Sequence, residues 1–196
     1  MIGLRAFRLS NAERTTLLSA ARDAIESVTI QRPEHPSGAE SEGRLAELGA
    51  CFVTLVAPDN TLRGCVGSLS FTRSLSAACR AMAVAAATRD PRFPPLEKTE
   101  LSGVRVNLSV LSPPTRIASI AEIEVGRHGV VVQRGDDQGV LLPQVASDQG
   151  WDGQTFAENT CRKAGIDPAT LDDGRTTLEV FDAEVFSEPR SAPVAK

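Results

Sequence analysis

The chain has 196 residues, a formal net charge of −4, a single Trp and no Tyr. A chain of this length can bury a core without disulfide bonds or bound metals. The acidic balance, the absence of a Lys/Arg cluster and the scarcity of aromatic rings argue against binding to nucleic acid, which needs cationic and stacking surfaces. We therefore do not expect a nucleic-acid partner.

Membrane insertion and metal binding are also not indicated. The longest apolar run, Ala81 to Ala87, is far too short to span a bilayer, and residues 1–8 lack the apolar core of a signal peptide. The four cysteines show no C-x-x-C spacing, and only two histidines, His35 and His128, accompany them. We expect a cytoplasmic protein with free thiols, no membrane contact, no metal and no cofactor.

The chain begins with a predicted helix followed by a loop. Ser10-Asn11-Ala12-Glu13 has the spacing of a capping box, and apolar residues then recur at helical intervals to about residue 30. Residues 32–43 collect Pro, Gly, Ser and acidic side chains without apolar periodicity, so they predict a mobile surface loop. His35 lies in that loop and is expected to be solvated.

A hairpin and a second helix come next. Ala50–Val56 and Leu62–Leu69 are typical of β-strands, and a turn-rich interval of hairpin length separates them. Ser74 is placed to cap an alanine-rich helix, which Asp90-Pro91 ends because proline cannot continue it. The small side chains of this helix should allow close packing on a sheet.

The second half of the chain adds strands, another helix and a tail. In order, the sequence predicts a strand at 104–110, a hairpin of 129–133 and 139–142, a helix at 155–164, a strand at 176–186 and a disordered tail at 187–196. Hairpins instead of regular crossovers favour a largely antiparallel sheet with flanking helices. The predicted class is therefore α+β.

The segment Leu62–Leu69 is the first candidate site. In an extended strand, Leu62 and Val66 should face a core while Arg63 and Cys65 face the other way. Two glycines bracket the thiol, and glycine in a strand marks a bulge or the close approach of another backbone or a ligand. The pattern thus predicts a thiol beside open backbone.

Two interpretations of Cys65 remain open. A guanidinium at Arg63, two residues away on the same face, would raise the thiolate fraction of a thiol whose ordinary pKa is about 8.5 and so activate it as a nucleophile. Alternatively, Cys65 is a small buried hydrophobe and Arg63 pairs with a surface carboxylate.

Other candidate residues lie farther along the chain. Arg92, in the stiff proline-rich run 90–95, is a candidate for holding an anionic group, and the alternative is a rigid helix stop. His128 stands between glycines and is a candidate base for Cys65 or a structural histidine bonded to a turn. Gln144 and Trp151 follow a strand end, and Trp151 is better explained as a packing anchor than as a ligand platform.

Dinucleotide-binding, P-loop and zinc-hydrolase motifs are absent.

The run Leu62-Arg63-Gly64-Cys65-Val66-Gly67 closely resembles the L-R-G-C-I-G signature of the AMMECR-one family, also called AmmeMemoRadiSam system protein A. Further segments similar to the family follow in its order, at 52–55, 90–95, 109–111, 126–129, 141–146, 150–152 and 161–165. Val66 replaces the usual Ile, and Ser68-Leu69 replaces a pair that often includes Thr and an aromatic residue. The resemblance covers most of residues 8–188.

The resemblance implies an α+β fold in which one AMMECR-one-like domain, residues 1–196, consists of a larger and a smaller sub-domain that interlock. It also implies association with a radical-SAM enzyme and a Memo-type protein. The family has no established reaction, so the resemblance does not supply a substrate. Fold and function have to be argued separately.

Three hypotheses follow. In the first, the chain is an enzyme or enzyme component: Cys65 is the nucleophile or thiol ligand, His128 moves protons, and Arg63 or Arg92 holds an anionic group. In the second, a non-catalytic adaptor module presents Arg63-Gly64-Cys65-Val66-Gly67, with Arg92 and Trp151, to a partner protein. In the third, Cys65 and His128 bind a small molecule or metal without turnover. The predicted ligand-binding set is Arg63, Gly64, Gly67, Arg92, Gln144 and Trp151.

Overall fold

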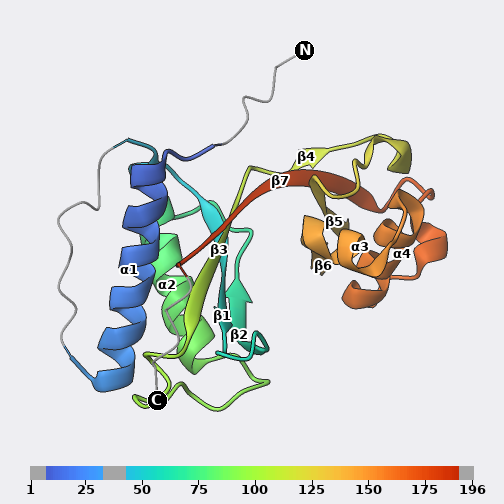
Figure 1. Cartoon of the computed structure of the whole chain (residues 1–196). Helices are drawn as coiled ribbons and strands as arrows, with labels where there is room; N and C mark the ends of the chain where they lie inside the picture. The colour runs from blue at the N-terminus through green and yellow to red at the C-terminus, as the bar shows by residue number, and fades with distance from the viewer. Residues whose placement is uncertain (1–7, 33–42, 190–196) are drawn as a thin grey trace. The chain divides into compact units, whose positions relative to one another are not determined.

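The computed structural model describes residues 8–32 and 43–189 (Figure 1). The chain forms two compact units: unit 1 comprises residues 1–111 and 184–196, and unit 2 comprises residues 112–183. His35, nearly all of the predicted loop 32–43 and the end of the predicted tail 187–196 lie outside the described residues. The interlocking of two sub-domains stays a prediction.

Unit 1 begins with the predicted helix, α1, Asn11–Ile30. Ser10 accepts a hydrogen bond from the Glu13 backbone N–H, and the Glu13 carboxylate accepts one from the Ser10 backbone, so the capping box is confirmed. Gln31 ends the helix in a left-handed conformation. A face that includes Leu17 and Ile25 is fully buried.

In unit 1, β1 (Ala50–Val56) lies between β2 (Leu62–Gly67) and β3 (Arg105–Leu111) and pairs antiparallel with both. Helix α2, Leu75–Thr88, begins after the predicted Ser74 cap and packs on β1 and β2. Figure 1 shows α1 and α2 together on one side of these strands. Val53, Leu55 and Leu108 project from the sheet into the core shared with these helices.

A β-bulge changes the expected face of one residue in β2. Leu55 pairs with Gly64 but Val56 pairs with Leu62, so Arg63 has no partner of its own. An extra residue in one strand shifts the alternation of side chains. The prediction that Leu62 faces the core is therefore wrong: its side chain is exposed, whereas Val66 packs against the core as expected.

Unit 2 contains the predicted second hairpin, with β5 His128–Arg134 and β6 Asp137–Leu141. β5 also pairs with β7, Thr177–Ser187, which in turn pairs with the short β4, Thr115–Arg116. Helix α4, Gly153–Ala164, packs on β5 and β6 and ends at Gly165, as predicted. The last residues of β7 pass into unit 1.

Several short elements complete the fold. Helix α3, Pro143–Gln149, was not expected from the sequence, and 3₁₀ turns lie at Gly43–Ala46, Ile120–Glu122 and Pro168–Thr170. All the pairings described above are antiparallel, so the α+β class with a largely antiparallel sheet is confirmed. Within the described residues, each helix is too short or too polar to cross a membrane.

Candidate functional site

Arg63 is tied to the segment that follows α2. Its Nε and Nη2 donate to the two carboxylate oxygens of Glu100 over 2.6 and 2.8 Å, and its Nη1 donates to the carbonyl oxygen of Pro94 over 3.1 Å. The bond to Glu100 raises the pKa of Arg63, and the same bond lowers the pKa of Glu100. The guanidinium thus fixes the bulged part of β2 to residues 94–100, because a two-bond arginine–carboxylate pair is directional.

Asp90 holds the backbone of Cys65, a role that sequence analysis missed. Its carboxylate is buried and accepts from the Cys65 N–H at 2.8 Å, and it also accepts from Arg92 through Nε at 2.9 Å and Nη2 at 2.7 Å. Arg92 Nη2 donates to the Cys65 carbonyl oxygen at 3.2 Å as well. The guanidinium bonds hold the pKa of Asp90 far below its usual range. We call Asp90, Arg92 and the Cys65 backbone the Asp90 clamp.

Arg92 is fixed in place and still open to solvent. Its side chain is 54% exposed, and within the described residues its Nη1 donates to no protein atom. The ring of Phe93 has the guanidinium carbons of Arg92 and Arg63 at 5.6 and 5.9 Å from its centroid, within cation–π range. Arg92 therefore presents one free edge of a guanidinium whose other edge is already bonded.

The Cys65 thiol lies on the face of the sheet opposite the helices. Thr54 Oγ1 donates to its Sγ at 3.2 Å, and the pairings Thr54–Cys65 and Thr54–Asn107 place the three side chains in a row across β2, β1 and β3. Within the described residues, Asn107 Oδ1 is buried without a hydrogen-bond partner. The thiol is half-buried, and Arg63 makes its bonds to Glu100 and to backbone carbonyls instead of to the sulfur. Arg92 lies closer to the thiol: the pKa of Arg92 is raised chiefly by its bond to Asp90, and the Cys65 side chain adds to this effect.

The two glycines of the segment lie where a side chain would collide. A Cβ at Gly64 would come within 2.4 Å of the Ala86 carbonyl oxygen of α2, and one at Gly67 would come within 2.2 Å of the Phe52 ring. Both positions therefore have a packing reason for glycine. For Gly64, the close approach is to another backbone, as the sequence analysis allows.

His128 lies in unit 2, whereas Cys65 lies in unit 1. The His128 ring is buried, and its Nδ1 accepts from the Glu124 N–H at 3.1 Å. A neutral ring that accepts at Nδ1 carries its proton at Nε2, so in this arrangement it offers a donor instead of the free acceptor that a base needs. The Cys65–His128 dyad stays a prediction.

Gln144 and Trp151 also lie in unit 2. Gln144 is exposed on α3, and the Trp151 side chain packs against the core of unit 2, while the backbone N–H of Trp151 donates to the Ala146 carbonyl oxygen at 2.9 Å. Trp151 therefore fills the packing role that the sequence favours. Among the described residues, no group of three or more His, Cys, Asp or Glu side chains is arranged to hold a metal ion.

Thiol labelling should separate the cysteines. Cys51, Cys79 and Cys161 are at most 1% exposed and Cys65 is half-buried. The interaction with the Cys51 thiol, together with burial, raises the pKa of Cys79. Because thiol reagents attack an accessible thiolate, we expect a water-soluble disulfide reagent to label one thiol rapidly in the folded protein and four in denaturant. Cys65→Ser should remove the rapid phase. Rapid labelling of a second thiol in the folded protein would contradict the described burial.

Comparison with known proteins gives the chain's relatives. The AMMECR1 family matches residues 18–186. A protein of Methanothermobacter thermautotrophicus is 40% identical over 191 residues, covering 92% of this chain and 96% of that one. Protein MK0488 of Methanopyrus kandleri is 41% identical over 153 residues, covering 74% of each.

The crystal structure of the uncharacterized protein PH0010 from Pyrococcus horikoshii is also similar. It has a TM-score of 0.86 at 35% identity, over 94% of this chain and 95% of that one. None of these names states an activity. The family match over most of the chain, together with relatives that are similar over nearly their whole length, shows that this chain belongs to the AMMECR1 family.

Proposed function

We propose that this protein is a non-catalytic binding module that recognises an acidic segment of a partner protein through Arg92 and the clamped Cys65 segment. The observation that carries the proposal is the state of Arg92: Asp90 and the Cys65 carbonyl fix its guanidinium while more than half of its side chain is exposed. A fixed arginine loses little conformational entropy when it binds a carboxylate.

The surrounding contacts support the same function. The bonds of Arg63 to Glu100 and of Asp90 to Cys65 give the segment a rigid frame, so the motif residues act as supports for a surface. Interfaces of this kind commonly depend on a few arginine and aromatic residues. The radical-SAM and Memo-type proteins that the family resemblance implies are the first partners to test.

The test is direct binding of purified partners to variants of Arg92. Arg92→Gln should weaken binding about tenfold or more, because a charge-assisted hydrogen bond contributes about 1.5–3 kcal/mol. Arg162→Gln is the matched control: Arg162 is 55% exposed and, like Arg92, pairs with a carboxylate, but it lies on α4. Binding is measured by calorimetry, and thermal unfolding verifies that each variant is folded.

Two results would refute this function: equal affinity of the folded Arg92→Gln variant and the native chain, or no binding to either partner.

A Cys65-dependent enzyme is the second candidate, because the half-buried thiol receives a hydrogen bond from Thr54 that would stabilise a thiolate. Cys65→Ser separates the two. Binding retained in Cys65→Ser supports the module, whereas loss of a turnover in the intact complex with binding retained supports the enzyme.

A further inference from the structure

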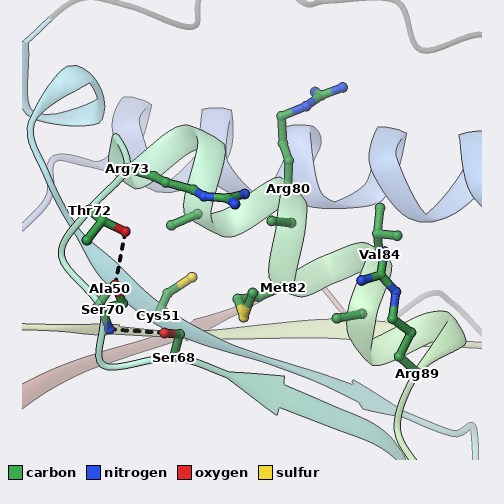
Figure 2. A pocket seen from close by; sticks show the side chains of 13 residues that line it. Ala50, Cys51, Ser68, Ser70, Thr72, Arg73, Arg80, Met82, Val84 and Arg89 are labelled. Carbon is green, nitrogen blue, oxygen red and sulfur yellow. Dashed lines mark hydrogen bonds between the residues drawn. The ribbon is translucent and has the colours of Figure 1, made fainter.

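A pocket of about 560 Å³ lies beside α2 in unit 1 (Figure 2). Its walls come from the start of β1, from residues 68–73 after β2 and from one face of α2. The volume is within the range of small-molecule sites. The pocket is lined by none of Arg63, Cys65 and Arg92, so it is distinct from the Arg92 surface.

The pocket is cationic although the chain is acidic overall. Arg73, Arg80 and Arg89 line it, and no Asp or Glu does, in a chain with a net charge of −4. Within the described residues, the guanidinium groups of Arg73 and Arg89 form no hydrogen bond or ion pair, whereas Arg80 has an interaction partner. Figure 2 shows Arg73 extending into the pocket from the end occupied by the hydroxyl residues and Arg89 standing at the far end of α2. Two guanidinium groups without a partner, Arg73 and Arg89, in a pocket whose lining holds no carboxylate favour an anion.

Hydroxyl groups gather at the Arg73 end. Ser68 Oγ accepts from the Ser70 N–H at 3.0 Å, and Ser70 Oγ and Thr72 Oγ1 are 2.9 Å apart, so one of them donates to the other (Figure 2). This arrangement leaves the Ser68 hydroxyl proton and one proton of the Ser70–Thr72 pair without a partner among the described residues. A hydroxyl can donate one bond while it accepts others. This end thus offers at least two hydroxyl donors and one guanidinium.

The rest of the wall is apolar and made hollow by small side chains. Ala78, Ala81 and Ala85 recur at helical spacing along α2 and line the pocket. Met82 of the same helix also lines it (Figure 2). Larger side chains at the alanine positions would fill the space. The pocket therefore combines an anion-binding end with an apolar bed.

We infer that this pocket binds a small organic anion. A phosphate monoester or a carboxylate is held by Arg73 with the Ser68, Ser70 and Thr72 hydroxyls, and the apolar body of the ligand lies along the alanines of α2. Arg89, at the opposite end, adds a longer-range attraction. The inference does not depend on the function proposed for Arg92.

Calorimetry on the full chain tests the inference with three probes: phenyl phosphate, benzoate and neutral benzyl alcohol. At least one anion should bind with a millimolar or tighter constant, and the alcohol should bind about tenfold more weakly. The stronger anion tells whether the site prefers a phosphate or a carboxylate. Equal binding of all three probes, or no binding of either anion, would overturn the inference.

Variants then locate the binding. Arg73→Gln should weaken the anion about tenfold and Arg89→Gln less, because Arg73 starts from the end of the pocket that holds the hydroxyls and Arg89 lies at the far end of α2 (Figure 2). Ala81→Leu keeps the charges and suits a helix but fills the hollow, so it should abolish binding. Arg32→Gln is the control, since Arg32 lies in unit 1 outside the pocket with a side chain 53% exposed. Unchanged binding in folded Arg73→Gln and Ala81→Leu would place the anion elsewhere and reject the site.

Discussion

Asp90→Asn should lower the free energy of unfolding by about 3 kcal/mol at neutral pH. The carboxylate is buried and accepts bonds from the Cys65 N–H and from Arg92. An asparagine of the same shape turns one acceptor into a donor that faces donors, and leaving a buried group without a partner costs about 1–3 kcal/mol in addition to each lost charge-assisted bond. Urea denaturation measures the difference.

The same variant should change the dependence of stability on pH. The pKa of Asp90 lies below the ordinary value of an aspartate, chiefly because Arg92 donates to the carboxylate. A group with a depressed pKa in the folded state stabilises the protein above its unfolded pKa of about 3.9, and this contribution is lost as the pH falls toward the folded pKa. The native chain should therefore lose stability below about pH 4 more steeply than Asp90→Asn.

A control and a contrary outcome make this test specific. Glu158→Gln also removes a carboxylate paired with an arginine, but this pair joins successive turns of α4 at the surface, where such pairs contribute about 0.3–0.5 kcal/mol. Its effect should be small. If Asp90→Asn were no more costly than Glu158→Gln, the Asp90 clamp would not be an important support for the Cys65 segment.

Local signals account for the parts of the fold that sequence analysis predicted. The Ser10–Glu13 capping box, the Ser74 cap and the end of α4 at Gly165 each depend on residues within one or two turns of one another. Hairpins β1–β2 and β5–β6 likewise join neighbouring segments. Such features can be predicted because the residues that form them are adjacent in the chain.

Elements with weak local patterns were missed. Helix α3 has seven residues and mostly polar side chains, and Leu142 at its N-cap makes no capping bond, so the usual start signal was absent. The bulge that exposes Leu62 depends on the register between β1 and β2. A register is set by pairing across strands, and the alternation within β2 alone does not reveal it.

The candidate site shows the same limit more clearly. Arg63 and Arg92 were identified as important, but their distant partners were not. Arg63 binds Glu100, which is 37 residues away, and Arg92 binds the carbonyl oxygen of Cys65. Asp90 was interpreted only as part of a helix stop, yet it bonds to a backbone group 25 residues earlier in the chain. The pocket beside α2 was also missed. A run of alanines predicts close packing of a helix, and it does not show where the neighbouring segments leave a cavity.

Gly64→Ala should destabilise the protein by about 1–3 kcal/mol, the usual cost of overpacking. The new Cβ would lie 2.4 Å from the Ala86 carbonyl oxygen, which is part of the α2 backbone. Neither β2 nor α2 can relieve this contact by turning a side chain, so one element has to shift. Because α2 packs on both β1 and β2, the shift would disturb the core that they share.

Gly67→Ala provides the matched comparison, because it adds the same methyl group to the same strand. Its obstacle is the ring of Phe52, a half-buried side chain that can change rotamer, so the cost should be smaller than at Gly64. Urea denaturation of both variants gives the two free energies. A larger loss in Gly67→Ala would show that Phe52 is the more rigid neighbour. A greater loss in Gly64→Ala than in Gly67→Ala is expected only if the close contact between β2 and the α2 backbone holds the Cys65 segment in position.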